Sequence, residues 1–431
     1  MSDSAPIPAL KARLCVMMFL QFFIWGVWYV PMWPYLSGLG IAPEKIGFAY
    51  SATGIAAMLS PIFIGMVADK FFPSQIVLGV LHVLGGVFLF LAANAAEWGS
   101  FFPLILAHLL CYMPTLALVN SVLFQSVADP QKDAPPIRTL GTIGWIVSGI
   151  VVGSSFLVGE EIVFQVPQFL GGPEAPHDAI GMGLTNTPLL IGAAVSVLLG
   201  VFCFFLPNTP PKLKGQKTTI GDVIGLKAIS LMRDRAFAVF IVCSLLICIP
   251  LSFYYQTANG YLKAMGVNNS EGVLTLGQVS EIFFLLLVPF FFRKIGVKNM
   301  LMIGMLFWVL RYIFFANGSS DAHALLFLGV LAHGICYDFF FFTGQLYVDK
   351  RAPEDIRSSA QGFIAFVTLG VGMFIGGIVN GWWNGKQTTT AEGADPVVDW
   401  SAVWYFPAIM AAVVLVAFVF LFKESTSEKS A

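Results

Sequence analysis

Long runs of apolar residues, separated by short polar segments, divide the chain into stretches that are long enough to cross a lipid bilayer. A membrane-spanning helix needs about 20 mostly apolar residues, because its backbone amides find hydrogen-bond partners only within the helix itself. The pattern predicts twelve spans, and the even number places both termini on the same side of the membrane. These spans cover residues 13–37, 44–69, 74–95, 100–127, 137–158, 184–206, 236–264, 271–293, 298–317, 322–350, 355–382 and 401–423.

The basic residues are distributed very unevenly between the two sides that these spans define. Of the 23 Lys and Arg residues, only Lys45, Lys263 and Lys386 fall on the side away from the termini, and Arg311 falls within a span. All the others lie on the side shared by the termini. Because short cytoplasmic loops are rich in Lys and Arg, we predict that both termini are cytoplasmic.

Composition supports a membrane protein and excludes several other classes. Hydrophobic residues make up 57% of the chain and charged residues 11%, whereas soluble domains carry about 25% charged residues. The net charge of −1 argues against nucleic acid as a partner. The six cysteines lie in apolar stretches without the paired spacing of a zinc site, so we expect no metal and no cofactor. The first apolar run lacks a small-residue cleavage site and is typical of an uncleaved first span.

An internal repeat indicates how the twelve spans are organised. The segment beginning Tyr35-Leu36 after the first span recurs as Tyr261-Leu262 after the seventh, and Cys111-Tyr112 recurs as Cys336-Tyr337 in the corresponding spans. Self-similarity in a constant order indicates duplicated architecture. We predict an N-terminal six-helix half (1–206), a linker (207–235) and a C-terminal six-helix half (236–431). Parallel halves of this kind are typical of the major facilitator fold, an all-α membrane architecture that binds its substrate between the halves.

Glycines at four-residue spacing mark helices that should have close neighbours. The pairs are Gly149 with Gly153, Gly372 with Gly376, and Gly377 with Gly381. Small residues at this spacing allow two helix backbones to approach closely inside a membrane. We therefore expect close helix packing along the fifth and eleventh spans.

Three ionisable side chains lie within the spans, where they are energetically expensive. An ionised side chain at the bilayer centre costs about 2.5 to 3.5 kcal/mol on insertion scales, so it normally faces a cavity, a partner or a transport pathway. We interpret Asp338 and Glu281 as candidates for proton coupling or substrate hydrogen bonding. The alternative is a buried ion pair with Arg311. His333 precedes Asp338 by five residues on the same span and is a further candidate for a proton relay, although a neutral, hydrogen-bonded histidine is the commoner role.

Several polar side chains recur on single helical faces. Gln278 and Glu281 are three residues apart and can present an amide and a carboxyl to the same ligand. Arg138, Thr142 and Trp145 follow one another at spacings of four and three along the fifth span. Such faces suit a ligand that combines sugar hydroxyls with a flat ring. The alternative for Arg138 is a loop cation near the end of its span.

The seventh predicted span is unusually polar. Tyr255, Gln256 and Asn259 lie within one turn of each other in this apolar run. This pattern favours a helix that lines a substrate cavity, although some of these side chains must simply pack.

At these residues the sequence resembles the nucleoside:H+ symporter family of the major facilitator superfamily, from the first span to the last. The resemblance implies that Arg138, Thr142, Gln278 and Glu281 contact a nucleoside and that Asp338 is essential for proton-driven transport. The densest matching segments are Phe19–Gly26, Tyr50–Ala57, Val67–Lys70, Tyr112–Leu116, Pro135–Gly144, Gln278–Glu281 and Arg357–Gly362.

Some positions depart from the pattern of that family. Trp145 and Tyr337 stand where the family has Phe, which preserves an aromatic wall. Ser252 and Tyr255 stand where the family has Gln and Asn, and His333 stands where it has Tyr. If these positions contact the base or ribose, the preferred substrate differs from that of the family: it is another nucleoside or a molecule outside the nucleosides.

We therefore expect a proton-coupled importer of nucleosides in a bacterial inner membrane, acting as a monomer. The alternative is a proton-coupled or facilitative transporter of a sugar or another small polar metabolite. A membrane-embedded enzyme is disfavoured because the sequence contains no HExxH helix, nucleophile elbow or phosphate-binding glycine loop. A ligand sensor would bind the same molecules without moving them.

Overall fold

The computed structural model describes residues 7–211, 226–390 and 396–423, with the side chains of 7–8, 61–63, 65–70, 131, 355 and 358 left out. The side chains of the matching segment Val67–Lys70 and the middle of the predicted linker therefore lie outside what is described. The chain forms two compact units. The N-unit is drawn from 1–41, 59–218 and 268–275, and the C-unit from 42–58, 219–267 and 276–431.

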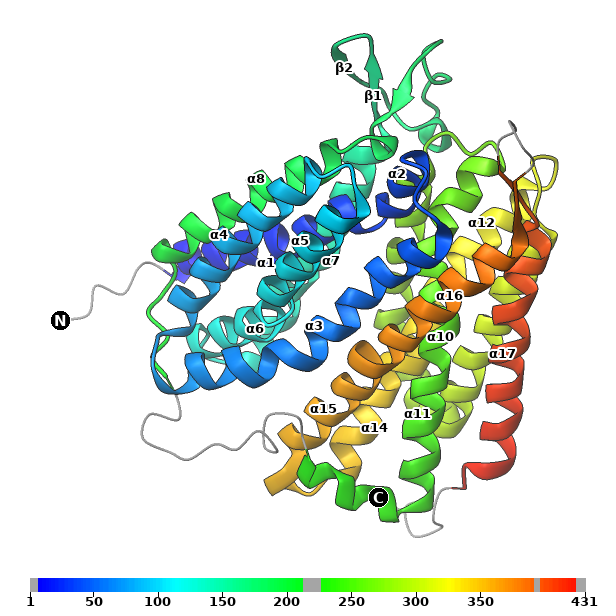
Figure 1. The fold of residues 1–431 in the computed structure, drawn as a ribbon. Coiled ribbons are helices and arrows are strands. Elements are labelled where there is room, and N and C mark those ends of the chain that lie inside the picture. The colour runs from blue at the N-terminus through cyan, green and yellow to red at the C-terminus, as the bar shows by residue number, and fades with distance from the viewer. Residues whose placement is uncertain (1–6, 212–225, 391–395, 424–431) are drawn as a thin grey trace. The chain divides into compact units, whose positions relative to one another are not determined.

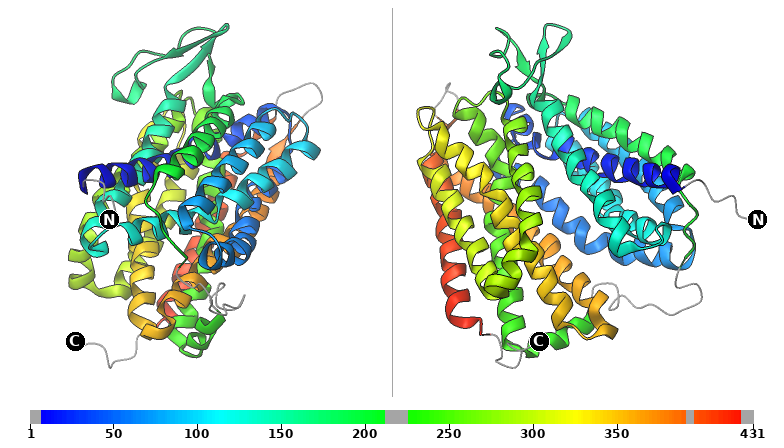
Figure 2. Two further views of the ribbon diagram at one scale, coloured as in Figure 1. Left: turned by 90° about the vertical axis from the view of Figure 1, so that its left-hand side faces the viewer. Right: turned by 180° about the vertical axis from the view of Figure 1, so that it is seen from behind.

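The N-unit is a bundle of apolar helices. Within it α1 packs along α7, and α4 packs along α8 and α5 (Figure 2). Two predicted spans are each divided into a pair of helices, just before Met32 and just before Thr115. Prolines at 31 and 114 stand at these breaks, because proline cannot donate the backbone hydrogen bond that a continuous helix needs. The helices are α1 (Ile7–Tyr29), α2 (Met32–Gly38), α3 (Pro43–Lys70, shared with the C-unit), α4 (Ser74–Ala93), α5 (Trp98–Tyr112), α6 (Thr115–Ser126), α7 (Pro130–Gly153) and α8 (Thr187–Phe202).

In the C-unit, two pairs of consecutive helices are each joined by a π-helical turn into one continuous rod. A π-helical turn, Asp338–Phe342, joins α13 to α14, and another, Phe366–Gly372, joins α15 to α16. Gly296 adopts φ 75° and separates α11 into two helical segments, a conformation that glycine reaches without steric cost. The helices are α10 (Arg235–Ala264), α11 (Ser270–Asn317), α12 (His323–Leu331), α13 (His333–Tyr337), α14 (Thr343–Arg351), α15 (Arg357–Ala365), α16 (Met373–Gln387) and α17 (Trp400–Leu421).

These helices account for the twelve predicted spans (Figure 1). Among the described residues, ten helical stretches are long and apolar enough to cross a membrane, and one of them, Ser270–Asn317, contains two spans. The remaining span is α3. The prediction of an all-α membrane fold with twelve helices is confirmed.

A small sheet follows α7 and corrects one predicted boundary. Helix α7 begins at Pro130 and ends at Gly153 instead of covering 137–158. The chain then forms an antiparallel sheet in the order β2-β1-β3, from β1 (Ser155–Val158), β2 (Glu161–Phe164) and β3 (Ile180–Gly181), which Figure 1 shows beyond the end of α7. Gly159 provides the positive φ of the turn between β1 and β2. A second, shorter pair is formed by β4 (Thr388–Thr389) and β5 (Val397–Val398).

Glycines of the predicted pairs lie where two helix backbones approach closely. In the N-unit, a Cβ added at Gly153 would lie 2.6 Å from the backbone nitrogen of Gly272, at the start of α11. In the C-unit, a Cβ added at Gly381 would lie 2.8 Å from the backbone oxygen of Pro43, at the start of α3. The predicted close packing of the fifth and eleventh spans is confirmed, and it ties the first turns of α11 and α3 to these two helices.

Candidate functional site

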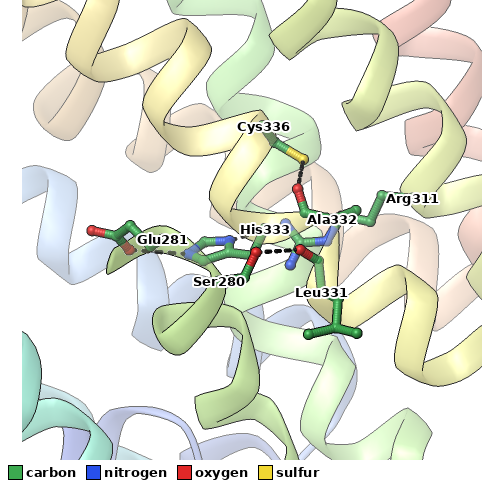
Figure 3. A network of polar contacts seen from close by, with 7 residues as sticks. All are labelled: Ser280, Glu281, Arg311, Leu331, Ala332, His333 and Cys336. Atoms are coloured by element: carbon green, nitrogen blue, oxygen red, sulfur yellow. Dashed lines mark hydrogen bonds and ion pairs between the residues drawn. The ribbon is translucent and has the colours of Figure 1, made fainter. Parts of the chain in front are cut away.

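The C-unit brings Glu281, His333 and Arg311 into one chain of polar contacts (Figure 3). The Oε2 atom of Glu281 lies 3.7 Å from Nε2 of His333, and Nδ1 of His333 lies 3.2 Å from Nη1 of Arg311. The side chain of His333 is 1% exposed, whereas that of Glu281 is 22% exposed. Arg311 is fully buried. Glu281, the acidic end of this series of contacts, is therefore open to a ligand, and Arg311, the basic end, is enclosed in the unit.

Arg311 is held by groups on three sides. Its Nε donates to the backbone oxygen of Gly329 at 3.0 Å, and its guanidinium carbon lies 3.3 Å from the ring centre of Tyr254. A guanidinium stacked on an aromatic face is stabilised by about 2 kcal/mol when desolvated. These contacts and the hydrogen bond to His333 compensate in part for the cost of burying the charge.

The segment of α11 that carries Glu281 is fixed against α12 and α13. Ser280 Oγ donates to the backbone oxygen of Leu331 at 2.6 Å, as Figure 3 shows. A Cβ added at Gly334 would lie 2.5 Å from the backbone of Ser280, so the two helices are in close contact at this point. Glu281 is consequently placed by backbone packing beside the ring of His333.

Aromatic rings surround the imidazole of His333. The ring of Tyr254 lies 5.1 Å away and nearly parallel, and those of Tyr337 and Tyr255 lie 5.5 and 6.2 Å away. Tyr337 and Tyr255 are half-buried and Tyr254 is buried. The predicted aromatic residues Tyr255 and Tyr337 thus lie beside His333, the residue that faces Glu281.

Asp338 lies at the start of the π-helical turn and is 1% exposed. Thr343 donates its hydroxyl to the backbone oxygen of Asp338 at 3.1 Å, which satisfies a carbonyl in the widened turn. The Oδ2 atom of Asp338 is buried without a hydrogen-bond partner among the described residues. Within the same residues, no ion pair joins Arg311 to Asp338 or to Glu281, so the structure does not support the alternative of a direct buried pair.

The other polar residues of α10 mostly connect helices. Asn380 donates to Oε1 of Gln256 at 2.8 Å and accepts from the hydroxyl of Thr257 at 3.0 Å, which ties α10 to α16. Gln256 and Asn259 are fully buried. Ser252, one of the positions that depart from the family pattern, is also buried and donates to the backbone oxygen of Cys248.

In the N-unit, Arg138, Thr142 and Trp145 lie along one face of α7. Arg138 is exposed, and Thr142 and Trp145 are half-buried. The ring of Trp145 lies 5.6 Å from that of Trp25 in an edge-to-face arrangement, and Trp25 in turn lies 5.8 Å from Tyr112. The predicted polar stripe on α7 therefore ends in an aromatic cluster that includes α1 and α5.

Sequence patterns did not reveal a second polar network in the N-unit. Gln21 is fully buried; its amide nitrogen donates to Thr115 at 2.7 Å, and its oxygen lies 2.8 Å from Nε2 of His82. The other ring nitrogen of His82 lies 3.2 Å from the hydroxyl of Ser196. These four residues come from four helices, so the only signal in the sequence is that each is a polar residue in an apolar span.

Comparison with known proteins identifies the family. The family described as nucleoside H+ symporter matches residues 9–427. The chain belongs to the nucleoside H+ symporter family. It is 46% identical over 424 residues to YegT of Escherichia coli (strain K12), with 97% of this chain and 95% of YegT covered. It is 32% identical over 431 residues to the nucleoside permease NupG of the same organism, with 96% of each chain covered.

A solved structure supports the same assignment. A crystal structure of a variant of the nucleoside transporter NupG superposes with a TM-score of 0.84 at 31% identity, covering 96% of this chain and all of the other. As a nucleoside H+ symporter the chain is a multi-pass membrane transporter with the major facilitator fold and not an enzyme. The predictions of family, fold and transport are confirmed. The roles of individual residues, the side on which the termini lie and the monomeric state stay predictions.

Proposed function

We propose that this nucleoside H+ symporter imports nucleosides by alternating access, with Glu281 and Asp338 performing different tasks. Glu281 binds the nucleoside, and Asp338 carries the coupled proton. The observation that carries the proposal is the contrast between the two carboxyls: one is partly exposed at the end of a polar chain, and the other is buried with an oxygen that lacks a partner among the described residues.

The binding face on α11 matches the chemistry of a nucleoside. Glu281 offers carboxylate oxygens to sugar hydroxyls, and Gln278, one turn earlier, can both donate and accept. Tyr255 and Tyr337 are half-buried beside His333 and offer ring faces for stacking on a base. We assign the sugar to Glu281 and Gln278 and the base to these rings.

The stripe on α7 in the N-unit carries groups that suit the base of a nucleoside. Arg138 has only donors, Thr142 has a hydroxyl, and Trp145 presents a large ring. Base carbonyl oxygens need donors, and Arg138 is exposed and able to provide them. We assign this stripe to the polar edge of the base. Gln256 and Asn259 contribute to packing and hold the wall in place, because both are fully buried.

Asp338 suits the coupling step because its environment penalises the charged form. An ionised carboxyl inside a membrane span is expensive, whereas a protonated carboxyl carries no charge. The transporter therefore changes conformation most readily with Asp338 protonated, and the proton moves with the nucleoside. The distribution of basic residues supports a cytoplasmic location for both termini, and we propose that a single chain is sufficient for transport.

The decisive experiment is uptake into proteoliposomes with an alkaline interior and a panel of labelled nucleosides. We expect accumulation above the external concentration, abolished by a protonophore. Accumulation of a labelled sugar, with no uptake of any nucleoside, would instead establish the alternative cargo. Binding without accumulation would indicate a sensor and would refute transport.

Binding-site variants test the assignment of the two faces. Glu281→Gln and Arg138→Ala each remove a charged hydrogen-bonding group, which contributes about 1.5 to 3 kcal/mol. We expect the nucleoside Kd, measured by calorimetry in detergent, to rise about 10- to 100-fold in each variant. Glu97→Gln makes the same chemical change at an exposed position and serves as the control. Unchanged affinity in both variants would refute the proposed site.

A further inference from the structure

We propose that Arg311 is a positioning residue that keeps His333 neutral with its proton on Nε2, so that His333 presents a fixed N–H donor beside Glu281 and is not a proton carrier. The proposal about the ring's proton rests on geometry alone. Its consequence for nucleoside binding rests on the proposed function.

The position of the proton follows from the chemistry of Arg311. A guanidinium has only N–H donors and accepts no hydrogen bond. Because Nη1 of Arg311 lies 3.2 Å from Nδ1 of His333, Nδ1 must accept and cannot itself carry a proton. In a neutral imidazole the proton then resides on Nε2. That nitrogen is the one that faces Oε2 of Glu281 at 3.7 Å.

A second proton on the ring would disrupt this arrangement. An N–H at Nδ1 would point at an N–H of Arg311, and two positive charges would be adjacent in a buried site. Arg311 cannot easily turn away, because its Nε is bonded to Gly329 and its plane is stacked on Tyr254. Arg311 therefore acts against protonation of His333.

The remaining neighbours of His333 do not reverse this conclusion. Tyr254 and Tyr255 approach from α10, and Tyr337 lies on the same helix as His333. Their hydroxyls are neutral. Glu281 is the negative group facing the ring among the described residues. It faces Nε2, the nitrogen that already carries the proton of the neutral form, across 3.7 Å, which is too long for a hydrogen bond. The charged and titratable groups around His333 are thus arranged to select one tautomer.

This arrangement determines which ligand groups Glu281 can accept. One carboxylate oxygen, Oε2, faces the fixed donor of His333 (Figure 3). At 3.7 Å the two groups do not bond to each other, so the N–H of His333 and the carboxylate oxygens of Glu281 both have hydrogen-bonding capacity left for a ligand. A tyrosine at position 333 would carry a hydroxyl that both donates and accepts, so it would not impose the same polarity. We infer that His333 and Glu281 together select a ligand group that accepts from Nε2 and donates to the carboxylate, such as a hydroxyl of a sugar.

The tautomer can be observed directly by ¹⁵N NMR of the full chain labelled on histidine. The chain has five histidines, and the spectrum of His333→Gln identifies the signals of His333 by difference. We expect Nδ1 to give a pyridine-type and Nε2 a pyrrole-type signal throughout the range from about pH 5 to 8, in which free histidine titrates. A proton on Nδ1, or conversion to imidazolium within that range, would overturn the proposal.

Transport by two variants at position 333 tests the consequence. The amide of Gln carries one acceptor and one donor, as the fixed tautomer does, whereas Phe carries neither. We expect His333→Gln to weaken nucleoside binding by about three- to tenfold, because one neutral hydrogen bond is made less well. We also expect it to keep pH-driven accumulation. His333→Phe should bind more weakly than His333→Gln.

The outcomes separate this inference from the proposed function. If His333→Gln bound nucleoside but no longer accumulated it under a pH gradient, His333 would be a proton carrier and the inference would be wrong. If the unmodified chain failed to accumulate nucleosides, the proposed function would fail while the NMR result on the tautomer would still stand. Size-exclusion profiles of both variants establish that they are folded.

Discussion

Replacing Asp338 with Asn should separate nucleoside exchange from proton-driven accumulation. The amide has nearly the shape of the protonated acid but can neither ionise nor release a proton. Asp338 is 1% exposed, and one of its oxygens is buried without a partner among the described residues. The variant therefore stays permanently in the uncharged form, which we propose to be the form that changes conformation.

The expected size of the effect follows from the cost of the charge. An ionised side chain within a span costs about 2.5 to 3.5 kcal/mol, which corresponds to a factor of about 70 to 370 at 1.36 kcal/mol per tenfold change. The unmodified protein with Asp338 ionised should change conformation slower by that factor. With one proton per nucleoside, a gradient of one pH unit supports a limiting accumulation of about tenfold. In Asp338→Asn that ratio should fall to one.

Two assays on the same proteoliposomes make the distinction. Accumulation of labelled nucleoside under a pH gradient should be lost in Asp338→Asn, whereas counterflow against internal unlabelled nucleoside should persist without a gradient. Asp349→Asn makes the same change on α14, at a side chain that is 51% exposed, and should accumulate normally. If Asp338→Asn accumulated nucleoside as the unmodified protein does, the reasoning from burial to coupling would be refuted.

Two further predictions concern stability. Gly381→Ala should lower the midpoint of thermal unfolding by an amount equivalent to about 1 to 3 kcal/mol, because the new methyl meets the backbone of Pro43. In the control Gly99→Ala, in α5, the methyl meets nothing within 4 Å, so the midpoint should not fall. Equal midpoints in the two variants would contradict the packing argument. Asp234→Ala removes a cap of α10 and the ion pair with Arg351, at a cost of about 1 kcal/mol. Burial raises the pKa of Asp234, but the backbone hydrogen bond at the start of α10 and the guanidinium of Arg351 lower it, and the net pKa lies below its usual value. Its contribution is therefore complete above the unfolded pKa of about 3.9 and is lost as the pH falls through the lower folded value, so the difference between the two proteins should disappear only in stronger acid; a difference that shrank already near neutral pH would be inconsistent with this account.

Hydropathy predicted the fold well because a bilayer imposes one length on every span. The positions of the twelve spans, and the close packing at Gly153 and Gly381, followed from rules that act within one helix or between two neighbouring helices. The boundary after Gly153 was wrong because Phe156 and Val158 continue an apolar run in a strand, and periodicity alone does not distinguish a short strand from a helix end. The π-helical turn at Asp338 was not visible either, because its residues also fit an ordinary helix.

The candidate site was predictable only in part. Glu281, Asp338 and His333 were recognisable because charged and polar residues are rare within spans. Their connections were not, since Glu281, Arg311 and His333 lie far apart in the sequence and meet only in the folded unit. Gln256 is a further case of an unforeseen connection: the sequence placed it on a polar helix, but did not indicate that its oxygen accepts a hydrogen bond from Asn380 of another helix.

The widened turn after Asp338 also determines how this rod tolerates changes in length. A regular α-helix advances by about 100° per residue, so deleting one residue within Asp338–Phe342 could restore ordinary helical winding without shifting either flank by a full turn. The hydroxyl of Thr343 now bonds the backbone oxygen of Asp338 across five residues. After the deletion the two would be four residues apart, a spacing at which a threonine hydroxyl still reaches a helical carbonyl. Tyr347, which is buried farther along the same rod, would keep its packing, because the deletion removes the extra residue of the turn and leaves the flanking helices in place. Natural shortening of this rod is therefore easier to accommodate at the turn than anywhere else along α13 and α14.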